Sequence, residues 1–446
     1  MFKKILIANR GEIALRIIRA CRDMDIQTVA IHSTADQNSL FVKLADESVC
    51  IGPPKSSESY LVAQRVLSAA EITGADAIHP GYGFLAENEE FAKVCESCGI
   101  AFIGPRPQDL ELMGDKIRSR QAMSKLGLSL LPSTLIQGDD IQNAKKAIEK
   151  MELPIIVKAS AGGGGKGIKI VRNMDDFWTT VKTAQAEAQA AFGDSTVYVE
   201  KYLESARHIE FQVAADKYGN VIHLGERDCS IQRRYQKIIE ESPSPAVDQK
   251  LRDEMGAKVV KALKEVGYQN VGTVEFLMDE KKNFYFLEMN TRIQVEHPVT
   301  EQVTNLDLIQ LQIRLASGEE LPYRQKDIQF SGHSMEFRIN AEDAEKFLPS
   351  CGKITDLHVP GGRGVRIDSG IYNGITITPY YDSMLAKLVI SAPDRAQVIR
   401  KAKAALQEFQ IEGISTNIPL HQRILEDESF QKNNISTRYL DKLLKK

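Results

Sequence analysis

The segment FYFLEMNTRIQVEHPVTE, residues 284–301, gathers carboxylates, an amide and a basic side chain within a short stretch. Together with the preceding TVEFLMDEKKN, it has the alternating apolar pattern of a β-hairpin. If the turn is centred on Lys281 and Lys282, Glu275 lies opposite Glu288 on the neighbouring strand. Like charges that face each other in a half-buried hairpin are destabilising, so we expect a cation to neutralise them.

Asn290 shares a strand face with Glu288, because side chains two positions apart point the same way. Two carboxylates and an amide oxygen are hard ligands that suit Mg²⁺ or Mn²⁺, especially when phosphates complete the shell. Solvated carboxylates at a sheet edge are the alternative. Arg292 offers a planar fork for a carboxylate or phosphate, and Glu296 can accept a proton. His297 precedes a proline, so we expect it to be structural.

A second candidate is the glycine run in IIVKASAGGGGKGIKIV, residues 155–171. Gly162, Gly164 and Gly167 match GxGxxG, but IKIV follows as a strand pattern where a dinucleotide site needs a helix. A P-loop also fails, because Gly167 follows Lys166 in place of Ser or Thr. A glycine hairpin that closes over an anion remains, with a long surface turn as the alternative. Metal ligands, an arginine, a base and this loop together predict phosphoryl transfer to a small anionic acceptor.

Composition excludes several classes of protein. The chain of 446 residues is too long for one ordinary core, and its net charge of -3 gives no general attraction to nucleic acid. Because no long apolar run is present, we expect no membrane partner. The N-terminal MFKKILIANRGEIALRII lacks a signal-peptide cleavage site, so we expect a cytoplasmic location. Cys95 and Cys98, in CESC, lack the further ligands of a zinc site and are expected to be free thiols.

The elements that must position these residues fall into three stretches. Strand and helix patterns alternate up to about residue 114, beginning with KKILIANR, GEIALRIIRACRDMD and QTVAIHS, which predicts a parallel sheet with helical crossovers. Its first turn, NRGEIA, has no GxGxxG, so we expect no dinucleotide site there. A middle stretch of hairpins and helices is α+β, and short strands with closing helices follow from about residue 331. The predicted fold class is therefore α/β and α+β.

Taken together, the motifs resemble biotin carboxylase, the ATP-grasp component of biotin-dependent carboxylases. The resemblance runs nearly end to end, through IHPGYGFLAEN, VKASAGGGGKG, ERDCSIQRR, EFRINAED and PYYDSMLAKL, and EMNTRIQVEHPVTE is among its most specific segments. It implies a three-domain ATP-grasp architecture. The expected domains are an N-terminal Rossmann-like biotin carboxylase domain at 1–114, an ATP-grasp domain at 115–330 with a glycine-rich lid at about 131–203, and a C-terminal mixed domain at 331–446.

The resemblance also implies an activity. The enzyme would use ATP with Mg²⁺ or Mn²⁺ to phosphorylate bicarbonate, and would pass the CO₂ of carboxyphosphate to N1 of biotin. The chain has no Met-Lys-Met biotinylation site, so a separate biotin carboxyl carrier protein is expected. A homodimer is also expected, as is a carboxyltransferase subunit. The final acceptor stays open between acetyl-CoA, in fatty acid biosynthesis, pyruvate and other acyl groups.

Roles carry over from the family residue by residue. Phosphates are expected to bind Lys116, Lys158, Gly164 and Gly165. The adenosine site is expected to include Glu200, Lys201, Leu203 and Gln232, with His208 nearby. The metal ligands would be Glu275, Glu288 and Asn290. Bicarbonate is expected to contact Lys237, Arg292, Gln294 and Val295, with Glu296 as its base. Biotin is expected beside Tyr82, with Arg338 stabilising its enolate.

Two positions depart from the family pattern, and two other functions compete. Tyr235 replaces a histidine that contacts nucleotide in many relatives, and Lys166 replaces an arginine, which keeps the charge but loses the fork. Tyr82 packing in a turn, Arg338 on a solvated strand and Lys237 on the surface are the alternatives for single residues. One competing function is another ATP-grasp ligase that joins a carboxylate to an amine through an acyl phosphate. The other is a nucleotide sensor without catalysis.

Overall fold

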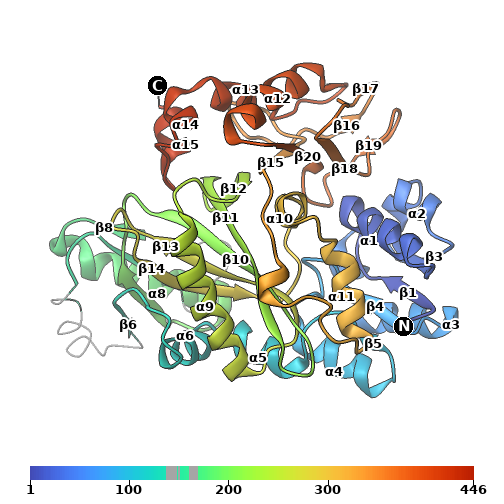
Figure 1. Cartoon of the computed structure of the whole chain (residues 1–446), viewed down its shortest axis with the longest axis horizontal. Helices are drawn as coiled ribbons and strands as arrows, with labels where there is room; N and C mark the ends of the chain where they lie inside the picture. Colours follow the sequence, from blue (N-terminus) through green and yellow to red (C-terminus); the bar gives the residue numbers. More distant parts are fainter. Residues whose placement is uncertain (137–147, 149–150, 160–168, 446) are drawn as a thin grey trace.

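Three groups of elements surround a central cavity in the computed structural model, which describes residues 1–136, 148, 151–159 and 169–445. The N-terminal group, the middle group and the C-terminal group occupy separate parts of the molecule (Figure 1). Among the described residues, no helix has the length and apolar character needed to span a membrane.

The N-terminal group is built on a parallel sheet in the order β3-β2-β1-β4-β5, as the alternating pattern predicted. Its strands are β1 (Lys4–Ile7), β2 (Gln27–Ser33), β3 (Glu47–Gly52), β4 (Ala77–His79) and β5 (Ala101–Phe102). Its helices are α1 (Gly11–Asp23), α2 (Leu40–Leu44), α3 (Ala63–Thr73), α4 (Glu89–Ser97) and α5 (Pro107–Gly114). Cys95, on α4, and Cys98, at its end, are free thiols as predicted.

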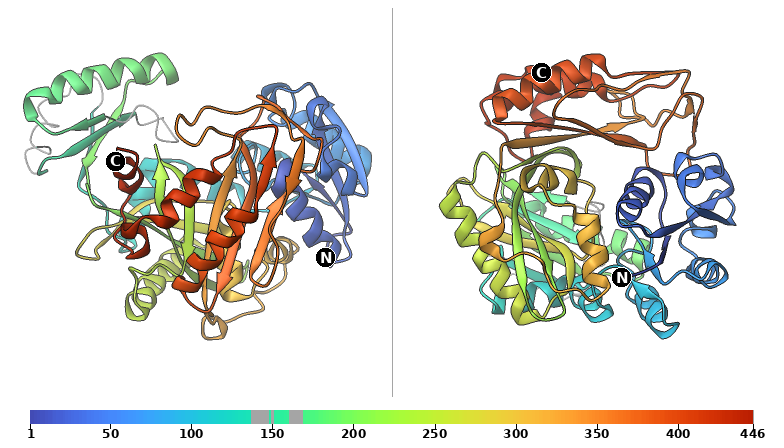
Figure 2. Two further views of the ribbon diagram at one scale, coloured as in Figure 1. Left: turned by 90° about the horizontal axis from the view of Figure 1, so that it is seen from above. Right: turned by 45° about the vertical axis from the view of Figure 1, so that its right-hand side comes forward.

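A small antiparallel sheet follows α6 (Lys116–Lys125) and stands to one side of the molecule (Figure 2). Its order is β6-β9-β7-β8, and its strands are β6 (Ser133–Ile136), β7 (Ile155–Ala159), β8 (Lys169–Val171) and β9 (Val197–Lys201). Helix α8 (Phe177–Phe192) buries Phe177 and Val181 against it. The strand predicted after the glycine run is β8. The run itself, with Gly164, Gly165 and Lys166, lies outside the described residues.

A large antiparallel sheet joins the middle and C-terminal groups in the order β14-β13-β10-β11-β12-β15-β20-β18. The strands are β10 (Arg207–Ala215), β11 (Val221–Arg233), β12 (Gln236–Ser242), β13 (Asn270–Met278), β14 (Phe284–Asn290), β15 (His333–Asn340), β18 (Val365–Ser369) and β20 (Met384–Ala392). Pairing of β12 with β15 carries the sheet across residue 330, where we place a domain boundary. That boundary therefore separates stretches of chain that share one sheet.

Helices and short strands cover and extend this sheet. The helices are α9 (Gln249–Val266), α10 (His297–Thr304), α11 (Leu308–Ala316), α12 (Arg395–Glu408), α13 (Ile418–Glu426), α14 (Glu428–Gln431) and α15 (Tyr439–Leu443). Two small ladders pair β16 (Gly352–Lys353) with β19 (Thr376–Ile377) and β17 (Asp356–His358) with β21 (Gln410–Glu412). Single-turn 3₁₀ helices lie at Thr34–Asp36, Ser56–Glu58, Met174–Asp176 and Gln325–Asp327.

The β13–β14 hairpin places Glu275 opposite Glu288, as the sequence predicted, although its turn differs from the prediction. Near the turn, Met278 pairs with Phe284, so the connection is centred one half-residue earlier than between Lys281 and Lys282. Lys282 has a left-handed φ of 62°, which suits a three-residue hairpin loop. A bulge between Glu275 and Phe276 then restores the predicted register. The shifted turn and the bulge therefore compensate each other, and Glu275 and Glu288 remain opposite each other.

Candidate active site

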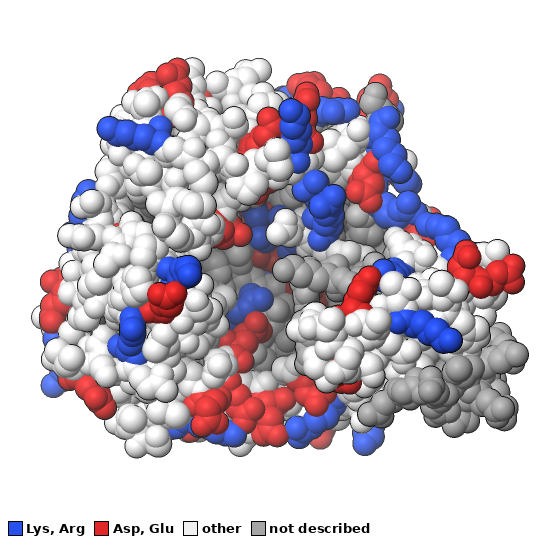
Figure 3. Space-filling view, turned by 180° about the vertical axis from the view of Figure 1, so that it is seen from behind, with Lys and Arg blue, Asp and Glu red and all other residues white. Residues whose placement is uncertain are grey.

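A cavity of about 1130 Å³ lies where the three groups of elements meet. Figure 3 shows a hollowed face of the molecule, with Lys and Arg side chains inside the hollow and along its margin. Every predicted site residue that the structure describes lines this cavity, from Tyr82 in the N-terminal group to Arg338 in the C-terminal group. Side chains far apart in the sequence are therefore gathered around one space.

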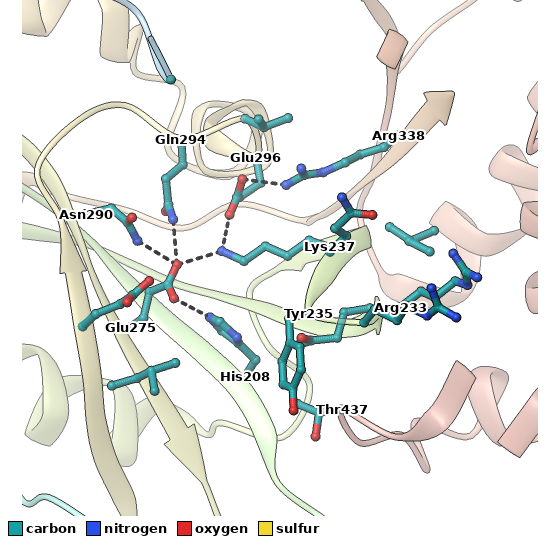
Figure 4. A pocket seen from close by; sticks show the side chains of 18 of the residues that line it. His208, Arg233, Tyr235, Lys237, Glu275, Asn290, Gln294, Glu296, Arg338 and Thr437 are labelled. Atoms are coloured by element: carbon teal, nitrogen blue, oxygen red, sulfur yellow. Dashed lines mark hydrogen bonds and ion pairs between the residues drawn. The ribbon is translucent and has the colours of Figure 1, made fainter. Parts of the chain in front are cut away.

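Lys237, on β12, is the centre of a buried carboxylate cluster (Figure 4). Its Nζ donates to Glu210 at 2.6 Å, to Glu275 at 2.9 Å and to Glu296 at 2.6 Å. Burial alone would lower the pKa of Lys237, but these three carboxylates hold it well above its ordinary value. Lys237 is a largely buried cation and not a surface lysine.

The opposed Glu275 and Glu288 have different surroundings. Burial favours protonated Glu275, but Lys237 and then His208 hold its pKa well below the usual range. Burial, and next the charge of Glu275, raise the pKa of Glu288. Among the described residues, no side chain donates a hydrogen bond to the Glu288 carboxylate. Asn290 donates to Glu275 at 2.9 Å from the same strand as Glu288. Two crowded carboxylates and an amide fit a hard divalent cation such as Mg²⁺ or Mn²⁺.

His208 adds a further ligand type to this corner. Its Nε2 lies 3.2 Å from Glu275 and 3.6 Å from Glu210, so one atom from each of these three side chains could reach a common ion. Although burial opposes protonation, the neighbouring Glu275 raises the pKa of His208 to about 9. In the absence of a metal ion His208 is therefore protonated at neutral pH, and it would have to lose this proton before Nε2 could ligate an ion. His208 also lines the cavity.

Glu296 lies between two cations at the start of α10. It accepts from Lys237 and, at 2.9 Å, from Arg338 Nη2. Burial favours its protonated form, but the charge of Lys237 lowers the pKa of Glu296 below its ordinary value. Arg338 also pairs with Glu240, whose Oε1 accepts from Nε at 2.6 Å. Arg338 is thus held in the cavity by two carboxylates, which excludes a freely solvated strand face.

Arg292 and Gln294 complete this side of the cavity. Arg292 Nε donates to Glu87 at 3.0 Å, and its Nη2 donates to Asn290 at 3.0 Å. Gln294 donates to Glu275 at 2.8 Å and accepts from Arg227 at 2.7 Å. Arg292, Lys237 and Arg338 line the same part of the cavity, and three cationic side chains there suit the binding of a small anion.

The other end of the cavity is more apolar and lies against the small sheet. Glu200, on β9, accepts from Arg120 at 2.6 Å and from Lys158 at 2.8 Å, so its carboxylate is already paired. Lys201 donates to the Glu152 carbonyl at 2.7 Å. The remaining predicted residues at this end also line the cavity: Lys116, Leu203 and Gln232. A flat base and a phosphate chain fit this combination of apolar walls and lysines.

Two tyrosines occupy opposite margins of the cavity. The Tyr82 hydroxyl donates to Glu12 in a short hydrogen bond, so Tyr82 is anchored as well as packed in its turn. Tyr235 is half exposed and lies near Thr437 (Figure 4). It and Arg234 form a two-residue turn between β11 and β12, and both have positive φ. His297 is fully buried and contacts the Gln294 carbonyl, which agrees with the structural role expected for it.

Sequence reasoning missed several charged residues that hold the site together. These are Glu12, Glu87, Arg120, Glu210, Arg227 and Glu240. Arg227 is fully buried and donates to Glu210, Gln212, Thr273, Gln294 and Thr300. For Glu210, Arg227 and Glu240, which lie on β10, β11 and β12, the available signal was charge within largely apolar strands, as in RHIEFQV. The pairing of β10 with β11 brings Glu210 and Arg227 opposite each other.

Comparisons with known proteins cover the whole chain. Family models match at residues 1–110 (biotin carboxylase, N-terminal domain), 115–324 (carbamoyl-phosphate synthase L chain, ATP binding domain) and 336–442 (biotin carboxylase C-terminal domain). Biotin carboxylase of Haemophilus influenzae is 52% identical over 100% of this chain and 99% of its own length. Biotin carboxylase 1 of Bacillus subtilis is 52% identical over 99% of this chain and 98% of its own length.

Solved structures are similarly close. The biotin carboxylase domain dimer of Hydrogenobacter thermophilus 2-oxoglutarate carboxylase, in complex with MgADP, ADP and bicarbonate, has a TM-score of 0.95 and 50% identity over 100% of this chain and 99% of that one. Biotin carboxylase of Campylobacter jejuni, in a β,γ-ATP complex, has a TM-score of 0.96 and 48% identity over 99% of each chain.

Proposed function

The chain belongs to the biotin carboxylase family, and we propose that it catalyses the ATP-dependent carboxylation of biotin with bicarbonate, through carboxyphosphate. The observation that carries this proposal is the arrangement of Glu296 between Lys237 and Arg338, beside the opposed Glu275 and Glu288. A base, two cations and a pair of metal-binding carboxylates thus face one cavity that also has room for a nucleotide.

Each residue has a role that its surroundings support. Lys237 and Arg292, with Gln294 and Val295, hold bicarbonate as a small anion. Glu296 enters as a carboxylate, because its pKa is lowered, and removes the bicarbonate proton. Attack of bicarbonate on ATP brings two anions together, which the surrounding cations make possible. Arg338 cannot lose its proton and stabilises the biotin enolate while CO₂ adds.

Glu275, Glu288 and Asn290 are the residues that we assign to Mg²⁺ or Mn²⁺, and the bound ion would offset the negative charge of the ATP phosphates. Lys116 and Lys158 lie on the phosphate side of the cavity, and Glu200, Lys201, Leu203 and Gln232 lie on the nucleotide side. Tyr82 is assigned to the biotin side, next to Glu12.

The partners follow from this function. We assign the biotin to a separate carrier protein, and the acceptor reaction to a carboxyltransferase subunit. The dimeric biotin carboxylase domain of the Hydrogenobacter thermophilus enzyme supports a homodimer. The relatives include carboxylases of pyruvate and of 2-oxoglutarate, so the acceptor of this system stays open. The cytoplasmic location and the three domain boundaries stay predictions from the sequence.

The direct test is ATP hydrolysis by the purified chain with Mg²⁺, with bicarbonate or without it, and with free biotin or without it. We expect hydrolysis to require bicarbonate and to rise with biotin. Glu296→Ala should lose the stimulated rate by roughly 10² to 10⁴-fold, the usual contribution of a positioned base. Glu280→Gln, on the exposed hairpin turn, is the matched control and should behave as wild type.

Other outcomes separate the alternatives. Hydrolysis that needs no bicarbonate, or that biotin leaves unchanged, would contradict the proposal and favour an ATP-grasp ligase for other carboxylates and amines. ATP binding without any turnover, in wild type as in Glu296→Ala, would favour a nucleotide sensor.

A further inference from the structure

Lys387, on β20, is a fully buried lysine that does not line the described cavity. In the large sheet it pairs with Arg338 on one neighbouring strand and with Asp368 on the other. Residues directly opposite each other in a sheet project to the same face, so the Lys387 side chain lies next to that of Arg338. A buried ammonium is costly unless it is well paired, so its partners indicate what it does.

The partners of Lys387 come from all three groups of elements. Its Nζ donates to the Val295 carbonyl at 3.1 Å and forms ion pairs with Glu12 at 3.1 Å and Asp368 at 3.9 Å. Glu336, also fully buried, adds a further electrostatic interaction. Glu12 belongs to α1, Val295 to the segment before α10, and Asp368 to β18. One ammonium group thus links three segments that are distant in the sequence.

Two of these contacts lead directly to the cavity. Val295 lies between Gln294 and Glu296, so its carbonyl fixes the backbone on which both of those side chains stand. Glu12 accepts the hydrogen bond of the Tyr82 hydroxyl, which lies in the N-terminal wall of the cavity. Burial raises the pKa of Glu12, and the charge of Lys387 is the main interaction that opposes this rise. Lys387 therefore supports the anion side of the cavity and the Tyr82 side at once.

We propose that Lys387 is a positioning residue, which holds Val295 for bicarbonate and, through Glu12, Tyr82 for biotin. The inference rests on the proposed function, because that function assigns bicarbonate and biotin to these two parts of the cavity. Lys387 touches neither substrate. Its removal should therefore change the affinity for both while leaving the distant nucleotide end of the cavity intact.

The experiment compares Lys387→Met with wild type in biotin-stimulated ATP hydrolysis, with KM measured separately for bicarbonate, biotin and ATP. We expect KM for bicarbonate and for biotin to rise on the order of 10- to 100-fold, as small misplacements in active sites do. KM for ATP should stay within about twofold of wild type, because the nucleotide end of the cavity keeps its contacts. Arg252→Met is the control. Arg252, on α9, is also a buried cation, and it pairs with Glu226 on β11; neither residue lines the cavity.

A folded Lys387→Met enzyme with all three KM values unchanged would overturn the inference, as would equal changes in Arg252→Met. If Lys387→Met does not fold, the double variant Glu12→Gln, Lys387→Met also removes the charge of Glu12, one of the buried carboxylates that lose their cation. The double variant should still show the raised KM for bicarbonate, because Val295 has lost its donor, and a normal value would overturn the inference. Failure of the proposed function is distinguishable, because wild type itself would then show no bicarbonate- and biotin-dependent turnover.

Discussion

The glutamates that line the cavity or lie directly behind its wall differ in the direction in which their pKa is shifted. Lys237 and its neighbours lower the pKa of Glu275 and Glu296 in spite of burial, whereas burial raises the pKa of Glu240 to about 7. Glu288 faces Glu275 across the hairpin, and burial and then the charge of Glu275 raise the pKa of Glu288. At the scale of single residues, the balance between burial and neighbouring charges decides which carboxylates are ionised.

Glu288→Gln tests the assignment of the metal. The substitution keeps the shape of the side chain but removes one of the two crowded negative charges. We expect the Mg²⁺ concentration for half-maximal activity to rise by at least about tenfold, since a carboxylate ligand is replaced by a weaker amide oxygen. Activity measured against Mg²⁺ concentration, at saturating bicarbonate and biotin, gives this value.

The same variant gives a second, independent readout. Without metal, Glu288→Gln should unfold at a temperature equal to or above that of wild type, because repulsion from Glu275 is relieved. A variant that binds Mg²⁺ as wild type does would contradict the metal assignment, whatever its stability.

Sequence reasoning reached the residues whose neighbours lie within one hairpin. Glu275, Glu288 and Asn290 could be placed together because strand periodicity and one turn relate them. Lys237 and Arg338 were assigned by family resemblance alone, because their contact with Glu296 depends on strand pairings distant in sequence. Glu210 and Arg227 face each other in the local β10–β11 hairpin, but an opposed acid and base indicate only an ordinary ion pair until Lys237 is placed beside Glu210.

At the scale of elements, the seam between β12 and β15 holds the middle and C-terminal groups in one sheet. Glu241 on β12 accepts from His333 on β15 at 2.8 Å and from Arg395 on α12 at 2.8 Å. Burial favours protonated Glu241, but the hydrogen bond from His333 and the charge of Arg395 lower its pKa to about 2. These contacts therefore stabilise the seam only while Glu241 is ionised.

Glu241→Gln tests this seam through its pH dependence. The folded-state pKa is depressed from 4.5 to about 2, so the stabilisation is present above about pH 4.5 and is lost as the pH falls toward 2. A shift of this size corresponds to about 3 kcal/mol at pH 7. Urea unfolding should show a loss of that order at pH 7 and a smaller difference from wild type near pH 3. A difference independent of pH would contradict the ionised role, and Glu280→Gln is the exposed control.

Strained backbone gathers at the margin of the cavity. Phe84, Arg234, Tyr235 and Phe347 have positive φ, and all of them line the cavity. The Arg234–Tyr235 turn has the two-residue form that favours Asn-Gly, so its present residues cost stability. Strain of this kind persists where function requires the side chains.

The double variant Arg234→Asn, Tyr235→Gly should separate stability from function. We expect stabilisation of roughly 1 kcal/mol or more, measured by urea unfolding, because the turn is relieved of strain. We also expect a higher KM for ATP, because the ring of Tyr235 no longer covers the cavity. Tyr235→His, which keeps an aromatic ring, is the companion variant and should retain the wild-type KM. A stabilised enzyme with unchanged KM for ATP would show that the turn makes no contribution to binding.

At the scale of the whole molecule, three groups of elements contribute to one cavity, and no group contains the site alone. The alternating patterns were sufficient to predict the parallel N-terminal sheet and the strand after the glycine run. They could not predict that β12 would pair with β15, because nothing local in either strand specifies a partner about a hundred residues away. The bulge at Glu275 was likewise beyond reach, since it compensates a turn whose geometry depends on Lys282.

The most direct test of the proposed reaction follows the oxygen of bicarbonate. Wild type would be given ATP, Mg²⁺, biotin and bicarbonate labelled with heavy oxygen, and inorganic phosphate would be analysed by mass spectrometry before the label exchanges with water. If Glu296 activates bicarbonate to attack the γ-phosphorus, one labelled oxygen should appear in each phosphate released, and carboxybiotin should form in equal amount. Phosphate without label would mean that water attacks ATP, and would contradict the phosphorylation of bicarbonate at this site.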